Sequence, residues 1–175
     1  TSIKKSDNFL SCRGPDEHKS TESNLGNKNF IFSFHRLSII DLSENASQPM
    51  ASKELNTEIM FNGEIYNHAY LRNELESQGV KFTTSHSDTE TLLLGLSLHG
   101  NKFLEKIEGQ FSIAFLNKDK NTLTLIRDRL GQKPLYYYLN KEELIFSSNF
   151  KSVLSYKKNF SVAEEQISIF LELGC

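Results

Sequence analysis

The sequence predicts an α+β fold built from antiparallel sheets. Three observations support this prediction: two β-hairpin patterns in the second half of the chain, two helical segments in its middle, and tight turns between the expected strands. Parallel strands would need long crossover connections, so a doubly wound parallel sheet is not expected. The 175 residues suit one domain of ordinary size, long enough to bury a hydrophobic core.

Short apolar segments in the first half are predicted strands. Residues 30–35 form an aromatic run, and residues 58–61 form a second run that Asn62 and Gly63 would end as a turn. A third short strand is expected at 81–84. Residues 1–29 are polar and predict no strand.

Two central segments are predicted helices. The first covers 68–78, with Asn67 as its cap and Gly79 as its stop. The second begins at a capping box in which Ser87 would cap the helix and Glu90 would reach back to it, and it ends at Gly100. The apolar face of the first helix is formed by Tyr70, Leu71 and Leu75.

The second half predicts antiparallel hairpins followed by helices. One hairpin pairs 111–117 with 122–127, and the next covers 134–148. A short helix at 150–156 and a helix opened by a second capping box at 161–164 would follow.

Charge and composition argue against several classes of function. Lys and Arg total 20 and Asp and Glu total 22, which leaves a net charge of −2 and no electrostatic signature for nucleic acid. No apolar run approaches the roughly 18 residues that cross a membrane. Cys12 and Cys175 do not form a disulfide framework, and no His/Cys spacing suggests a metal site. The start lacks the apolar part of a signal peptide, so a cytoplasmic location is expected.

Polar residues at three places predict a binding pocket. The Asn62 side-chain amide beside the Gly63 N–H could donate two hydrogen bonds to one developing oxyanion. The Arg36 guanidinium could clamp a carboxylate, and Asp88 could face an ammonium group. Each has an ordinary alternative: an Asn-Gly turn, an ion pair of Arg36 with Asp41, and a carboxylate that favours a helix dipole. Together they favour a pocket for an α-amino acid with a reacting side-chain carbonyl.

Two charged turns, at 13–16 and 127–137, are interpreted differently. Their Arg, Asp and Gly residues are typical of turns held by ion pairs and by hydrogen bonds from side chains to the main chain. We expect them to maintain backbone geometry rather than to take part in chemistry.

Six motifs follow one another along the chain in a specific order. They are Arg13–Asp16, His35–Asp41, Gln48–Met50, Asn62–Asn67, Ser87–Glu90 and Arg127–Tyr137. With them the sequence resembles, from about Ser11 to Leu154, the glutamine amidotransferase domain of glutamine-hydrolysing asparagine synthetases. These are class II amidotransferases with an N-terminal-nucleophile (Ntn) hydrolase fold.

The resemblance implies a four-layer α/β/β/α sandwich with two antiparallel sheets between helical layers. It also implies that Arg36 holds the α-carboxylate of glutamine and that Asp88 and Glu64 hold its α-amino group. The Asn62 side chain and the Gly63 N–H would form the oxyanion hole. Main-chain groups of Leu37, Ser38, Ile39 and Ile40 would line the pocket.

The function implied is the glutaminase portion of an asparagine synthetase, which hydrolyses glutamine to glutamate and ammonia for the ATP-dependent amidation of aspartate. Residues 1–160 would be the amidotransferase domain without its N-terminal segment, and 161–175 would begin a linker or helix toward a synthetase domain. No cofactor or metal is expected in the amidotransferase domain. ATP and Mg²⁺ would belong to the synthetase domain, and a homodimer is compatible with the family.

Three positions depart from the family pattern. The family has a nucleophilic cysteine at its mature N-terminus, where this sequence has Thr1, and Cys12 stands where a histidine is usual. Asn149 replaces a usual glutamate. We therefore expect these 175 residues alone to bind glutamine weakly and not to hydrolyse it. The alternatives are an amidotransferase for another acceptor, such as a cell-surface sugar or peptide precursor, and a non-catalytic glutamine-binding domain.

Overall fold

The computed structural model describes residues 9–11, 14, 17–36, 47–156 and 164–173, which contain eight strands and five helices. The strands are β1 (Glu17–Leu25), β2 (Lys28–Arg36), β3 (Met50–Ser52), β4 (Thr57–Ile65), β5 (Gly109–Asn117), β6 (Thr122–Arg127), β7 (Tyr136–Leu139) and β8 (Leu144–Ser147). The helices are α2 (His68–Ser77), α3 (Asp88–His99), α4 (Asn101–Leu104), α5 (Phe150–Tyr156) and α6 (Glu164–Leu173).

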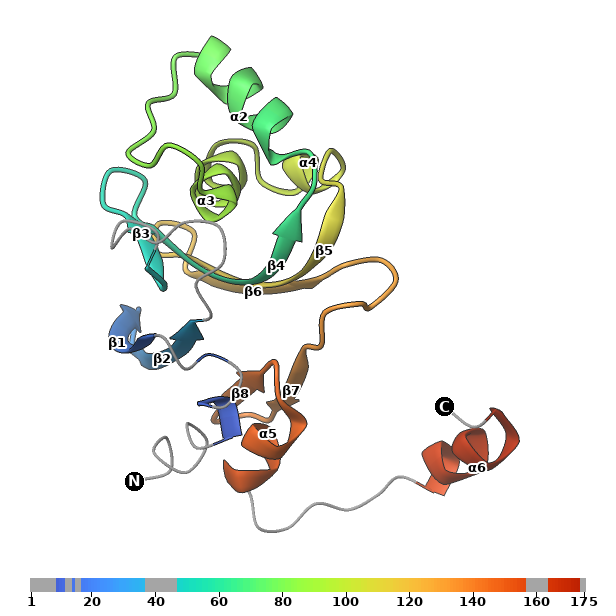
Figure 1. Cartoon of the computed structure of the whole chain (residues 1–175). Helices are drawn as coiled ribbons and strands as arrows, with labels where there is room; N and C mark the ends of the chain where they lie inside the picture. Colours follow the sequence, from blue (N-terminus) through green and yellow to red (C-terminus); the bar gives the residue numbers. More distant parts are fainter. Residues whose placement is uncertain (1–8, 12–13, 15–16, 37–46, 157–163, 174–175) are drawn as a thin grey trace.

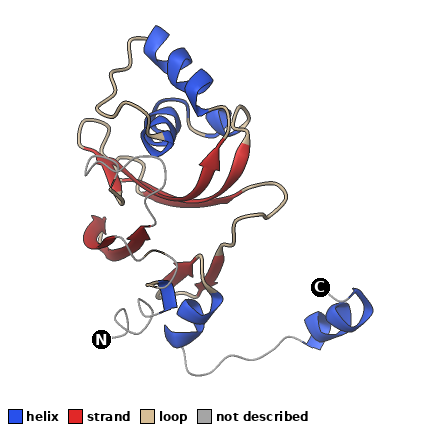
Figure 2. Ribbon diagram, viewed as in Figure 1, coloured by secondary structure: helices blue, strands red, loops and turns tan. Residues whose placement is uncertain are grey.

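These elements stack in the order helix, sheet, sheet, helix (Figure 1). The helices α2, α3 and α4 cover one face of a four-stranded sheet with the order β3-β4-β5-β6. Its other face looks toward two separate two-stranded sheets, β1-β2 and β7-β8, and α5 lies beyond the second of these (Figure 2). Every ladder is antiparallel, so the predicted α+β class is confirmed. The helix α6 lies apart from the layers.

Two hydrophobic clusters hold the layers together. The larger one packs the buried faces of α2 and α3 against the four-stranded sheet, and it contains side chains with almost no exposed surface, such as Ile59, Leu71 and Leu92. The smaller one joins β1 and β2 to the opposite face of the sheet through Leu25, Phe32 and Leu116. The sheet is therefore buried on both faces, as a four-layer arrangement requires.

Most of the predicted elements of the second half are confirmed. Residues 111–117 pair with 122–127, and Tyr136–Leu139 pairs with Leu144–Ser147. The helix expected at 150–156 has the same bounds in the structure. Asn149, at the usual glutamate position, accepts a hydrogen bond from the Lys151 N–H at 2.9 Å and so caps this helix.

The interpretation of Asn62 and Gly63 as a turn is wrong. Strand β4 continues through both residues to Ile65. Gly63 has φ 156°, and a Cβ atom there would lie 2.1 Å from the Gln110 carbonyl oxygen and 2.7 Å from the Phe111 Cα. The glycine is needed because the backbone of β5 passes too close for any side chain, a packing reason that no turn pattern contains.

Other local predictions also need correction. Residues 81–84 are not a strand but a loop, and β1 and β3 were not predicted because their sequences are short or polar. In α2, Leu71 and Leu75 are buried as expected, whereas Tyr70 is 67% exposed. Asn67 does not cap α2 with its side chain. Its amide instead bonds the Lys106 carbonyl and the Glu108 N–H, which ties α2 to the start of β5.

Replacing Gly63 by alanine should destabilise the protein by about 1–3 kcal/mol, because the new methyl group overlaps the backbone of β5. Urea unfolding measures this loss. Gly79→Ala is the matched control, since Gly79 also has a positive φ, of 87°, but nothing lies within 4 Å of the added atom. Equal losses in the two variants would show that backbone conformation, and not the contact with β5, decides the cost.

Candidate functional site

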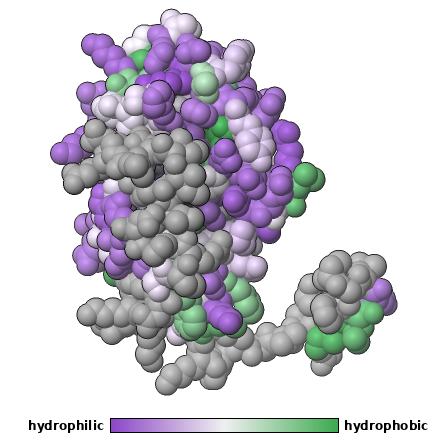
Figure 3. All heavy atoms as spheres, viewed as in Figure 1, coloured by the Kyte–Doolittle hydropathy of each residue, from purple (hydrophilic) through white to green (hydrophobic). Residues whose placement is uncertain are grey.

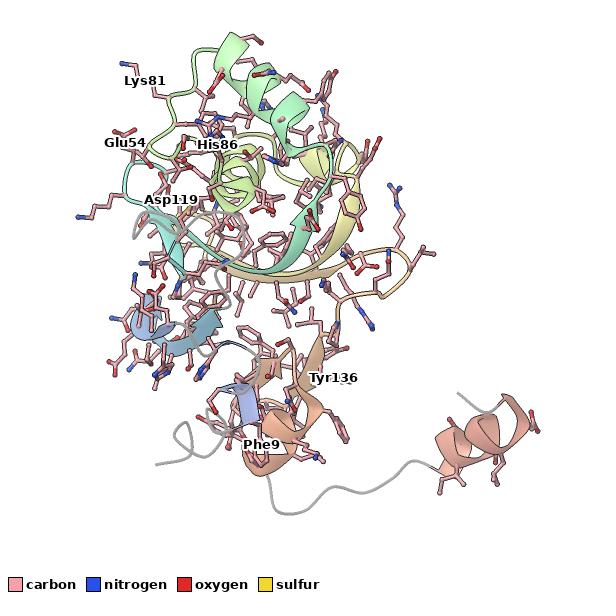
Figure 4. All side chains as sticks on the ribbon, viewed as in Figure 1. Phe9, Glu54, Lys81, His86, Asp119 and Tyr136 are labelled. Carbon is pink, nitrogen blue, oxygen red and sulfur yellow. The ribbon has the colours of Figure 1, made fainter. Side chains whose placement is uncertain are left out.

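A cleft of about 1260 Å³ lies between β4 and the two small sheets. Asn62, Gly63 and Glu64 line it from β4, and Asp88 lines it from the first turn of α3. The structure thus brings the predicted oxyanion donors and the predicted ammonium ligands into one cavity. The labelled His86, on the loop that leads into α3, also contributes to its lining (Figure 4).

The pairing of β4 with β5 sets the direction of the backbone N–H groups in the cleft. The Tyr66 N–H donates to the Glu108 carbonyl oxygen at 2.8 Å, and hydrogen-bonded and non-hydrogen-bonded pairs alternate along an antiparallel ladder. The N–H groups of Phe61, Gly63 and Ile65 consequently point away from β5. Strand β3 pairs with β4 only as far as Ile59, so no strand among the described residues pairs with these three groups.

Side chains satisfy two of these three N–H groups. The Phe61 N–H donates to Gln48 Oε1 at 2.6 Å, and the Ile65 N–H donates to Asp88 Oδ2 at 3.4 Å. Gly63 lies between them. Its N–H is therefore directed toward the space between the Gln48 and Asp88 side chains. A substrate oxygen in that space could accept a hydrogen bond from it.

The Asn62 amide is the second predicted donor. Its Nδ2 atom is buried, and no hydrogen-bond partner for it exists among the described residues. A buried donor without a partner lowers the stability of the folded protein by about 1–3 kcal/mol, so it indicates either strain or a group that hydrogen-bonds to a bound ligand. The Asn62 amide and the Gly63 N–H are neighbours in the cleft lining, and their role as an oxyanion hole stays a prediction.

Asp88 is a partly buried carboxylate next to these donors. Burial raises its pKa above the ordinary value, while the hydrogen bond from Ile65, the charge of His68 and hydrogen bonds from Thr89 act in the opposite direction. The net result is a desolvated anion with incomplete compensation. Such a group favours a cationic partner, and the contact of Asp88 with an α-ammonium group stays a prediction.

The remaining predicted site residues are Glu64, Arg36 and residues 37–40. Glu64 lines the cleft and is exposed. Arg36 ends β2, where its backbone pairs with Glu17, but its side chain is not among the described parts. Residues 37–40 lie outside the described residues, so their roles and that of Arg36 stay predictions.

Glu90 holds the loop that leads into the site. It does not reach back to Ser87 as the capping box predicted, although Ser87 does cap the helix by accepting from the Glu90 N–H at 3.2 Å. The Glu90 carboxylate instead accepts hydrogen bonds from the N–H and hydroxyl groups of Thr83 and Thr84, at 2.5 to 2.8 Å. Burial alone would raise the pKa of Glu90, but these hydrogen bonds, led by the Thr84 hydroxyl, outweigh it and lower the pKa.

The charged turn after β6 has the structural role expected of it. The Arg127 guanidinium donates to the carbonyl oxygens of Gly131 at 2.5 Å and Lys133 at 2.9 Å. The Asp128 carboxylate accepts from the N–H groups of Gln132, Lys133 and Phe111 at 2.8, 2.9 and 3.2 Å. This network fixes the loop that carries Lys133 to the rim of the cleft. The comparable turn at 13–16 lies largely outside the described residues.

Sequence reasoning missed Gln48 and Thr89 as site residues. Both are buried polar side chains in the cleft lining, with exposed fractions of 6% and 5%. The only sequence signal was the Gln48–Met50 motif, which carried no chemical interpretation, because a buried hydrogen bond between distant segments leaves no local pattern.

The described residues contain no group of three or more His, Cys, Asp or Glu side chains that could hold a metal ion. None of the helices in the described ranges combines the length and hydropathy needed to cross a membrane. In the space-filling view the surface around α2 is mostly hydrophilic, and hydrophobic surface is visible on α6, where Ile167 and Leu171 are exposed (Figure 3).

Comparison with known proteins agrees with this geometry. The model of the glutamine amidotransferase domain family matches residues 1–175, the whole chain. The chain belongs to this family. It is 35% identical over 169 residues to asparagine synthetase [glutamine-hydrolyzing] 1 of Bacillus subtilis and 41% identical over 148 residues to asparagine synthetase [glutamine-hydrolyzing] 2 of the same organism. These alignments cover 97% and 84% of this chain but only 26% and 19% of the relatives.

A solved structure shows the same fold. The glutamine phosphoribosylpyrophosphate amidotransferase of B. subtilis, solved with ADP and GMP, superposes with a TM-score of 0.67 at 18% identity, over 87% of this chain and 39% of that protein. At this identity the similarity establishes the fold alone. This amidotransferase domain therefore has the Ntn hydrolase architecture that the sequence implied.

Asp88→Asn should stabilise the ligand-free amidotransferase domain at neutral pH. Because burial raises the folded-state pKa of Asp88, the folded protein binds a proton more readily than the unfolded chain, and the charged form opposes folding. The stability gained by the variant should therefore be present at neutral pH and disappear as the pH falls toward about 4, the ordinary value for aspartate. Thermal melts at several pH values measure it, and a lower Tm for the variant at neutral pH would contradict the assignment.

Glu90→Gln should have the opposite pH dependence. The folded-state pKa of Glu90 is lowered, so its carboxylate contributes stability above the unfolded pKa and loses it as the pH falls through the folded pKa. The variant should be less stable than the parent at neutral pH, by about 1–3 kcal/mol for the weakened charged hydrogen bonds, and the difference should shrink in acid. Urea unfolding across the acid range provides the measurement. A constant difference between the two proteins at all pH values would exclude the carboxylate charge as the cause.

Proposed function

We propose that this domain binds L-glutamine in the β4–α3 cleft and is the glutaminase portion of an asparagine synthetase. One observation carries the proposal. The cleft is lined by the buried Asn62 Nδ2 atom, which has no hydrogen-bond partner among the described residues, by Gly63 of β4 and by the desolvated Asp88 carboxylate. Two neutral donors beside an anion match an amino acid with an ammonium group at one end and a carbonyl at the other.

The chain's own residues would bind and orient the substrate. Asp88, with Glu64 nearby in the lining, would pair with the α-ammonium group, and Arg36 would hold the α-carboxylate. The Asn62 amide and the Gly63 N–H would donate to the side-chain carbonyl oxygen and hold it more strongly as it becomes an oxyanion. This preference for the transition state is what lowers the barrier.

The reaction in the intact protein would follow the covalent route of the family. A cysteine thiolate attacks the side-chain carbonyl carbon of glutamine, and the carbonyl oxygen takes the negative charge at the Asn62 and Gly63 donors. The α-amine of the cysteine, which took the proton from the thiol, gives it to the amide nitrogen; the carbon–nitrogen bond then breaks, ammonia leaves, and a thioester forms. Water attacks the thioester and releases glutamate and the free cysteine.

We infer that the acceptor of the ammonia is bound by a different domain. The chain spans about a quarter or less of the length of the two synthetases described above. We propose that a synthetase domain binds aspartate, ATP and Mg²⁺ and uses the ammonia, and that the amidotransferase domain needs no cofactor of its own. We also propose that the protein forms a homodimer and that it is located in the cytoplasm.

The binding test uses the 175-residue chain and calorimetry with L-glutamine, L-glutamate and D-glutamine. L-Glutamine should bind, D-glutamine should not, and Asp88→Asn should weaken L-glutamine about 10- to 100-fold, the value of a charge-assisted hydrogen bond. Binding of L-glutamine with the same affinity in the variant would remove Asp88 from the site. Absence of L-glutamine binding to the parent chain would contradict the proposed function.

Asn62→Ala tests the oxyanion hole in a form of the protein that carries its nucleophile. Glutamate release should fall by roughly 10²–10³ while the KM for glutamine changes little, because the donor acts mainly in the transition state. Asn29→Ala is a matched control, since Asn29 also lines the cleft but on the β1–β2 hairpin. Turnover within a few-fold of the parent would assign Asn62 a structural role, and no turnover in the parent would favour a non-catalytic glutamine-binding domain.

A further inference from the structure

Gln48 connects two elements of the site that are far apart in the sequence. It immediately precedes Pro49 and β3, and it is buried, with an exposed fraction of 6%. Gln48 Oε1 accepts from the Phe61 N–H of β4 at 2.6 Å, and Gln48 Nε2 donates to Thr89 Oγ1 of α3 at 3.4 Å. One side chain therefore bridges the strand that carries the oxyanion donors and the helix that carries the ammonium ligand.

The bridge closes into a ring of hydrogen bonds. The Thr89 hydroxyl donates to Asp88 Oδ1 at 3.5 Å, and Asp88 Oδ2 accepts from the Ile65 N–H at 3.4 Å. The ring thus leaves β4 at Phe61 and returns to it at Ile65, and Gly63 is the residue halfway between. The N–H assigned to the oxyanion hole is therefore at the centre of the segment that the ring spans.

The direction of each hydrogen bond in the ring follows from the first one. A backbone N–H only donates, so the oxygen of the Gln48 amide must face Phe61 and its NH₂ group must face Thr89. The Thr89 oxygen then accepts a hydrogen bond from the Gln48 NH₂ group, and the Thr89 hydroxyl hydrogen is directed toward Asp88. Gln48 in this way supplies Asp88 with a donor that stabilises the carboxylate and fixes its orientation.

We propose that Gln48 is a positioning residue that sets the distance between the Asp88 carboxylate and the Asn62–Gly63 donors and so selects glutamine over asparagine. The inference rests on the proposed function of the cleft. Residues two apart on an extended strand are separated by about 6.6 Å. The Ile65 N–H, which holds Asp88, and the Gly63 N–H, which would hold the substrate oxygen, are therefore a fixed distance apart. Asparagine is one methylene shorter than glutamine and would leave one end of that span unpaired.

The test compares Gln48→Met, which keeps the size of the side chain but removes both hydrogen bonds, with Thr89→Val, which breaks the ring at another link. Ser97→Ala is the matched control. It removes the 2.8 Å contact of Ser97 with Thr57, which joins the same two elements, α3 and β4, at their far ends. Calorimetry gives the affinities for L-glutamine and L-asparagine, and thermal melts give the stability of each variant.

Both ring variants should weaken L-glutamine about 10-fold and leave L-asparagine within about twofold, a loss of selectivity that corresponds to one or two hydrogen bonds. Ser97→Ala should lower stability without changing the ratio of the two affinities. Equal weakening of both amino acids by Gln48→Met, or an unchanged ratio, would overturn the inference and leave Gln48 a purely structural residue.

A second readout separates this inference from the proposed function. In ligand-free protein, Gln48→Met and Thr89→Val should both shift the NMR signal of the Ile65 amide, because Asp88, which accepts a hydrogen bond from both Thr89 and Ile65, would change its position. Ser97→Ala should leave that signal in place. If the parent bound neither amino acid, the proposed function would fail and the Ile65 signal would decide whether the ring positions Asp88. An unmoved signal in both ring variants would overturn the positioning role.

Discussion

The register of β4 against β5 is the constraint on which the rest of the site depends. Because hydrogen-bonded pairs alternate along the ladder, every second N–H of β4 is directed away from β5. Strand β3 pairs with the beginning of β4, as far as Ile59. Further along, the Phe61 N–H donates to Gln48 and the Ile65 N–H donates to Asp88, and the Gly63 N–H lies between them. A shift of one residue would turn these groups toward β5 and place the Asn62 side chain on the other face of the sheet.

Three carboxylates in and around the cleft, those of Asp88, Glu90 and Asp128, have different environments. Glu90 and Asp128 accept several hydrogen bonds from neighbouring backbone groups, and each holds a loop in place. Asp88 is only partly compensated, and burial raises its pKa. This difference in hydrogen bonding, rather than position in the sequence, distinguishes the carboxylate suited to a ligand from those that maintain structure.

The backbone of the site is packed tightly between β4 and β5, independently of any substrate. Gly63 and Gly109 face the opposite strand so closely that a Cβ atom at either would overlap its backbone, at 2.1 Å from the Gln110 oxygen and 2.3 Å from the Glu64 oxygen. Two strands in such close contact leave little freedom for β4 to move relative to β5. A donor held in this way needs little reorganisation when charge develops on a substrate, which is the property that makes such donors effective.

The α+β class, the helices α2 and α3, the hairpins and the polar motifs of the site could be predicted from the sequence, because they depend on local periodicity, caps and motifs. The sequence did not show that Asn62 and Gly63 lie within a strand, since the Asn-Gly pair has the local signature of a turn and only the approach of β5 decides otherwise. Nor did it indicate the roles of Gln48 and Glu90, whose partners are set by tertiary contacts. Local patterns select elements, whereas the partner of a buried polar group is fixed only when distant segments pack together.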